Sequence, residues 1–147
     1  MNPQALVQFL RDAEHNGIFQ APTAGRSVLI AAASETGLQF FECEFDGLDD
    51  AALILESIGE GIGLPEWYGA NLDALHDCLT DLSWQETPAT LLLLTGCEEI
   101  RATNPEWFDR LIGVLVEVAD FWRGEETPFS VFIDATDGAF PRLPDHL

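Results

Sequence analysis

The sequence predicts an α/β fold in which a three-stranded parallel sheet is packed with helices. Three apolar segments of strand length, residues 38–45, 90–94 and 129–133, are separated by stretches with helical spacing of apolar residues. Strands that alternate with helices favour parallel pairing, because the chain must cross back between consecutive strands. The 147 residues, 47 % of them hydrophobic, are enough for one domain with its own core.

The N-terminal part is expected to add a helix and an extra antiparallel strand. Apolar residues recur at helical spacing over Pro3–Glu14, and Asn16-Gly17 supplies the stop. The apolar run Val28–Ala33 predicts a short strand, and Ser34–Gly37 predicts a turn into Leu38–Phe45. Two strands joined by so short a turn would be antiparallel.

Capping signals mark three further helices. Asp49 or Asp50 can cap a helix that ends in a glycine-rich stretch. Asn71 is a favourable N-cap for a helix over residues 72–82. Residues 104–124 predict the longest helix, because an asparagine, a proline and a glutamate stand in turn where a helix start favours them.

The charge of the chain restricts its partners. Six arginines, with no lysine, stand against 26 acidic residues, which gives a net charge of −20 at pH 7. Such a surface repels phosphates and anionic lipid, so we expect no binding of nucleic acid or membranes, and a cationic partner would be attracted. Solubility alone is the plainer explanation of the charge.

The location and redox state of the protein are also expectations from sequence. No apolar run approaches the ~20 residues that a membrane helix needs, and the first residues lack the basic start of a signal peptide. We therefore expect a cytoplasmic protein. Its three cysteines, Cys43, Cys78 and Cys97, cannot all pair and form no Cys-x-x-Cys motif. We expect reduced, buried thiols, and no metal or cofactor is implied.

The predicted helix over residues 72–82 carries a row of carboxylates. Asp73, Asp77 and Asp81 stand at positions i, i+4 and i+8, opposite an apolar side. Like charges at this spacing destabilise a helix by roughly 0.2–0.5 kcal/mol per pair. No basic residue lies between Arg26 and Arg101 to relieve them locally.

Four interpretations of this row are open. It could be a solvated polar face, a metal site formed by Asp73, His76 and Asp77, a carboxylate pair for acid–base catalysis, or a row of anions presented to a basic protein. The metal site lacks a further ligand, and catalysis lacks a nearby nucleophile. The neighbouring Trp67-Tyr68 favours a protein interface, although we expect at least one of the two to pack in the core.

Residues 64–80 carry a longer and more specific pattern. They read Leu-Pro-Glu-Trp-Tyr-Gly-Ala-Asn-Leu-Asp-Ala-Leu-His-Asp-Cys-Leu-Thr. This segment strongly resembles the signature of the barstar family, the intracellular inhibitors of barnase-type ribonucleases. The resemblance covers about residues 38–134, which we take as a barstar-like domain. Residues 1–37 would form an N-terminal extension packed on that core, and residues 135–147 a C-terminal tail.

The resemblance implies an inhibitor and not an enzyme. In the family, the loop and helix of this motif plug the active site of a basic ribonuclease, and acids replace the RNA phosphates. The chain would then be a bacterial immunity protein or antitoxin, a monomer when free. Asp77 would be the principal acid and Asp73 the second. The further toxin contacts implied are Trp67, Tyr68, Gly69, Asn71, His76, Thr80, Asp81 and Asp120, with Glu117 as the alternative to Asp120.

Four positions depart from the family pattern. Trp67 replaces a tyrosine, Ala70 an acid, His76 an aromatic residue and Asp81 a small residue. Because pocket-facing positions decide partner choice, these changes indicate a different or reshaped target. A toxin of another fold, or a metal- or ligand-binding regulatory domain, is the alternative that the residues leave open.

Overall fold

A parallel sheet with helices on both faces organises the chain. The computed structural model describes residues 2–22, 25–144 and 147. In this part of the chain four strands form one sheet in the order β1-β4-β3-β2, and every pairing is parallel. The predicted α/β class is therefore confirmed, and the sheet has one parallel strand more than the sequence analysis predicts. The strands are β1 (Gly17–Gln20), β2 (Gln39–Glu44), β3 (Thr90–Thr95) and β4 (Phe129–Ile133).

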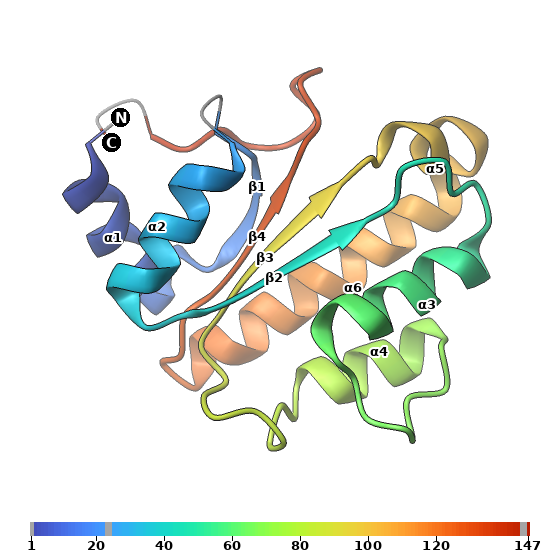
Figure 1. Cartoon of the computed structure of the whole chain (residues 1–147), viewed down its shortest axis with the longest axis horizontal. Coiled ribbons are helices and arrows are strands. Elements are labelled where there is room, and N and C mark those ends of the chain that lie inside the picture. Colours follow the sequence, from blue (N-terminus) through green and yellow to red (C-terminus); the bar gives the residue numbers. More distant parts are fainter. Residues whose placement is uncertain (1, 23–24, 145–146) are drawn as a thin grey trace.

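Helices cover the two faces of the sheet unequally. The helices of the N-terminal part lie on one face, and helices that follow later in the chain lie on the other (Figure 1). No helix of the described residues is long and apolar enough to span a bilayer. The first face carries α1 (Pro3–Arg11) and α2 (Arg26–Thr36), and the second carries α3 (Ala51–Ile62), α4 (Leu72–Leu79) and α6 (Pro105–Gly124), with the short α5 (Glu98–Thr103) beyond the end of β3.

The central strands divide the core into two clusters. Successive side chains of a strand point to opposite faces of its sheet. Leu91 and Leu93 of β3 accordingly pack with the residues of α1 and α2, whereas Leu92 and Leu94 pack with those of α3, α4 and α6. All four leucines are buried. This two-sided burial explains why β3 is a continuous apolar run instead of an alternating pattern.

The predicted strand at Val28–Ala33 is wrong, because these residues lie inside α2. Short apolar runs do not distinguish a strand from a buried helix. The alanines of this run favour a helix, and its buried residues recur at helical spacing. The predicted turn at Ser34–Gly37 is instead the end of α2, where Gly37 has the left-handed φ of 76° that ends many helices.

The extra strand is β1, not the segment that the sequence analysis predicts, and it is parallel, not antiparallel. Gly17–Gln20 pairs with residues 130–133 of β4. The first helix ends earlier than predicted, at Arg11, because Asp12 starts a short 3-10 turn over Ala13–His15. The short helix α5 has no counterpart among the elements predicted from sequence.

A buried asparagine joins β1 to the rest of the core. Asn16 is only 4 % exposed. Its side-chain nitrogen donates hydrogen bonds to the carbonyls of Ala119 (3.3 Å) and Thr127 (2.9 Å), and its side-chain oxygen accepts one from the amide of Phe129 (2.8 Å). One side chain thus connects the start of β1, the end of α6 and the start of β4.

We expect Asn16→Ala to lower the free energy of unfolding by about 2–4 kcal/mol, because the change leaves two buried carbonyls and one buried amide without their partner. Urea denaturation would measure it. Gln8→Ala, on the exposed side of α1, is the control and should change the unfolding free energy by less than about 0.5 kcal/mol. Equal effects of the two substitutions would contradict this account of Asn16.

Candidate functional site

The apolar side of α4 fixes the direction of its carboxylates. Leu75, Cys78 and Leu79 are buried, whereas Asp73 and Asp77 are exposed on the opposite side. Asn71 caps the helix as predicted, because its side-chain oxygen accepts a hydrogen bond from the amide of Ala74 at 2.8 Å. The burial of one side therefore holds the acids in solvent.

The helix is shorter than predicted, and this moves one acid out of the row. α4 ends at Leu79, and Thr80 is its C-cap residue. Leu82, which is buried, has a left-handed φ of 52°. Asp81 consequently lies in the turn after the helix, where it accepts a hydrogen bond from the hydroxyl of Ser83 at 3.1 Å.

The carboxyl end of α4 is anchored to α6. The indole N–H of Trp122 donates a hydrogen bond to the carbonyl of Leu79 at 2.7 Å. The hydroxyl of Thr80 donates one to the carbonyl of His76 at 2.8 Å. These bonds satisfy carbonyls that a helix end otherwise leaves open, and they fix α4 against its neighbour.

The arginines of the chain form their ion pairs elsewhere. Arg26 pairs with Glu42, Arg101 with Asp137, and Arg123 with Asp120. Among the described residues, no arginine forms an ion pair with Asp73, Asp77 or Asp81. The side chain of Asp77 is 77 % exposed, and Nδ1 of the His76 ring, which is charged only when protonated, lies 3.9 Å from its Oδ1 atom.

The two candidate acids of α6 lie in different surroundings. The Oε2 atom of Glu117 is 3.6 Å from Nε2 of His76, so this acid adjoins the surface of α4. Asp120 is paired with Arg123 and lines a groove of about 750 Å³ beside β1. The geometry therefore brings Glu117, and not Asp120, next to α4.

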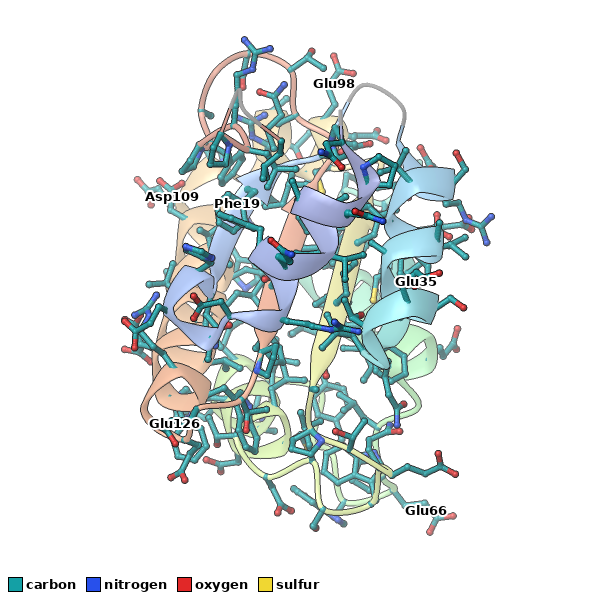
Figure 2. The ribbon with its side chains drawn as sticks, turned by 90° about the vertical axis from the view of Figure 1, so that its left-hand side faces the viewer. Phe19, Glu35, Glu66, Glu98, Asp109 and Glu126 are labelled. Carbon is teal, nitrogen blue, oxygen red and sulfur yellow. The ribbon has the colours of Figure 1, made fainter. Side chains whose placement is uncertain are left out.

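Loop 64–71 precedes α4 and lies at one end of the molecule. Figure 2 shows Glu66 projecting from this loop, with Glu98 at the opposite end of the protein. Gly69 and Asn71 are exposed, and Ala70 has a left-handed φ of 49°. The loop thus presents polar and small residues at the amino end of α4.

The two aromatic residues of the loop have different environments. Trp67 is 58 % exposed, and its ring meets that of Trp84 edge to face with 6.1 Å between centroids. Tyr68 is half-buried, and its hydroxyl donates a hydrogen bond to the carbonyl of Leu55 at 3.0 Å. Burial raises the pKa of its phenol. A Cβ atom at Gly59 would lie 2.9 Å from the Tyr68 ring, so this glycine of α3 makes room for it.

Sequence reasoning missed one residue of this surface, Trp84, and one contact, that between His76 and Glu117. Trp84 supports the exposed Trp67, and the histidine of α4 adjoins an acid of α6. Neither contact has a local signal, because each joins residues that are far apart in the chain. An apolar residue in the polar stretch after α4 is the one hint at Trp84.

The histidine and acids of α4 do not form a metal centre. Within the described residues no three His, Cys, Asp or Glu side chains are grouped so that they could hold a metal ion. The ring of His76 lies between Asp77 and Glu117 without a third ligand. The metal-binding alternative therefore has no geometric support.

The three cysteines are buried and free. Burial, with a smaller effect of Glu42, raises the pKa of Cys43 to about 12. Burial also raises the pKa of Cys78 and that of Cys97. Because the thiolate is the reactive form, these groups are inert in the folded protein.

The fold and this surface together define an acidic α/β protein with exposed carboxylates on α4, and comparison with known proteins gives its family. The family model described as Barstar (barnase inhibitor) matches residues 38–134, about two thirds of the chain. The chain therefore belongs to the barstar family. A protein of Bacillus subtilis (strain 168) named "Putative ribonuclease inhibitor YrdF" is 40 % identical over 50 residues, which are 33 % of this chain and 53 % of that protein. The match thus spans about half the length of this relative.

We expect none of the three cysteines of the folded protein to react with Ellman's reagent at about pH 8. Each thiol is buried and stays protonated at this pH. The same protein unfolded in guanidinium should show three reactive thiols within minutes, which is the internal control. A thiol that reacts rapidly under native conditions would contradict the burial described above.

Proposed function

We propose that the protein inhibits a basic ribonuclease by covering its active site with α4 and loop 64–71. The observation that carries the proposal is that Asp73 and Asp77 point into solvent, unpaired with any arginine in the described part of a chain of net charge −20. The family of the chain, and the ribonuclease inhibitor named among its relatives, supply the class of target.

The acids would replace the phosphates of RNA. A ribonuclease holds its substrate with cationic side chains, and an exposed carboxylate can make the same charge-assisted hydrogen bonds. We assign Asp77 to the centre of this contact and Asp73 to a second cation. The long-range attraction between a strongly acidic and a basic protein also accelerates their encounter.

Neighbouring residues would complete the contact. Trp67 is an exposed aromatic supported by Trp84, which is the type of residue that contributes strongly at interfaces. Tyr68 would act indirectly, because its ring and hydroxyl hold the loop on α3. Gly69, Asn71, His76, Thr80 and Asp81 would lie around the two central acids.

From α6 we assign Glu117 to this surface. It lies beside His76, whereas a contact from Asp120 would require that Arg123 move or share its partner. Asp120 stays a prediction of the family resemblance. The four departures from the family pattern favour a target with a reshaped active site, and a toxin of another fold is an outcome that the experiment below can identify.

The cellular role follows from the same argument. We propose an immunity protein or antitoxin that is kept in the cytoplasm and protects the cell from a ribonuclease. It would act without a cofactor and without catalysis, as a monomer that forms a one-to-one complex.

We expect Asp77→Ala to weaken binding of the ribonuclease by about 2–5 kcal/mol, mainly through faster dissociation, because a cation of the ribonuclease stays buried and unpaired. The partner is obtained by affinity capture on this protein and must show ribonuclease activity that the protein abolishes. Biolayer interferometry then measures the association and dissociation rates.

Glu35→Ala is the matched control for this experiment. It removes the same charge from an exposed position of α2, which covers the other face of the sheet (Figures 1 and 2). We expect its dissociation rate to equal that of the unmodified protein. Tight binding by Asp77→Ala, or capture of a basic protein whose ribonuclease activity is unaffected, would refute the proposed function.

A further inference from the structure

His76 lies between carboxylates of two helices. Its Nε2 atom is 3.6 Å from the carboxylate of Glu117 on α6, and its Nδ1 atom is 3.9 Å from that of Asp77 on α4. The histidine side chain is 38 % exposed, so both the proton and a partner can reach it. One ring therefore adjoins two acids of the surface that we assign to partner binding.

The other groups around His76 do not compensate these acids. Asp73 precedes it by three residues on α4, and the hydroxyl of Thr80 donates a hydrogen bond to its carbonyl. On α6, Arg110 precedes Glu117 by two turns, about 10 Å along the helix. No ion pair joins Arg110 to these acids in the described structure. Arg123, which follows Glu117 on α6, pairs with Asp120. His76 is thus the ionisable base that lies directly beside two of these acids.

His76 is the one histidine that the described residues place on this surface. Histidine is the side chain whose ordinary pKa lies between about 5 and 8, and exposed carboxylates stay ionised throughout this pH range. A neutral ring leaves Asp73, Asp77 and Glu117 with three negative charges. A protonated ring places a positive charge between two of these acids, where a cationic partner would also have to bind.

We propose that protonation of His76 weakens the binding of the cationic partner, so that inhibition depends on pH. This inference rests on the proposed function, since it concerns the same surface. It commits to a partner that brings cations to Asp77 and Glu117. A partner that instead brought an acid to His76 would bind more tightly at low pH.

The direction of the effect follows from linkage. If a cationic partner disfavours the protonated ring, binding releases a proton, and the affinity falls as the pH is lowered and the ring takes up a proton. One proton per complex limits the slope to about tenfold in the dissociation constant per pH unit. Acids and histidines of the partner also make the dissociation constant depend on pH. The test therefore compares variants of this protein with the same partner.

The experiment measures dissociation constants at about pH 8 and about pH 5.5 for two probes, the captured ribonuclease and hexa-arginine peptide. The peptide keeps its charge over this range, and the amide signals of α4 in NMR spectra report its binding at this surface. We expect the unmodified protein to lose about three- to tenfold more affinity than His76→Gln between these pH values.

Two further variants complete the test. His76→Lys keeps its positive charge over the whole range, so it should bind weakly at both pH values, with circular dichroism checking its fold. His15→Gln is the matched control, because His15 also lies 3.9 Å from a carboxylate, that of Asp12, but is stacked on Phe9 in the N-terminal part. The dissociation constant of this variant should depend on pH in the same way as that of the unmodified protein.

The results separate this inference from the proposed function. Equal pH dependence of the unmodified protein and His76→Gln with both probes would overturn the inference, and the effect of Asp77→Ala would still stand. Stronger binding by His76→Lys would overturn it as well. Loss of the Asp77→Ala effect would refute the proposed function, while the peptide still reports whether His76 controls the charge of α4.

Discussion

The alternation of buried side chains along β3 and β4 holds two separate helical layers on one sheet. Leu91, Leu93 and Phe132 point to the layer of α1 and α2. The residues next to them along each strand point to the layer of α3, α4 and α6. The position of α4 depends on this arrangement, because its apolar side has to complete the second layer. The direction of Asp73 and Asp77 is then a consequence of core packing and needs no further interaction.

The arginines of the chain relieve repulsion in other places and leave this surface acidic. Arg26, Arg101 and Arg123 each pair with an acid outside α4. The pKa of Asp137 lies below its ordinary value because the amide of Ala139 and the side chain of Arg101 both donate to its carboxylate. Acids that serve only solubility can be paired in this way. Like charges four residues apart on one short helix reduce its stability, which is consistent with the binding role proposed above.

The sequence predicts long elements with a strong pattern better than short ones. The helix predicted over residues 104–124 is found as α6 at Pro105–Gly124, although the side chain of its N-cap residue Asn104 makes no capping hydrogen bond. In contrast, Val28–Ala33 has too few residues to separate a strand from a helix, and β1 has four residues that pair with β4 more than one hundred positions later. Such pairing is decided by tertiary packing, which no local window contains.

The candidate surface shows the same division between local and tertiary information. Helical periodicity accounts for the shared side of Asp73 and Asp77 and for the burial of Cys78. The preference of asparagine for the N-cap position accounts for Asn71. The support of Trp67 by Trp84 and the approach of Glu117 to His76 depend on how three elements pack. Asp81 shows where local information fails. Helical periodicity assigns it to the row of carboxylates, but α4 ends at Leu79, so Asp81 lies outside the helix.

Hydrogen bonds to backbone carbonyls attach this surface to its neighbouring helices. Tyr68 holds the loop to α3 through the carbonyl of Leu55, and Trp122 holds the end of α4 to α6 through the carbonyl of Leu79. A surface that is already ordered loses little conformational entropy on binding, so more of the charge attraction is available as affinity. The same packing places His76 between Asp77 and Glu117, so the proposed protonation of one ring would act on two acids at once.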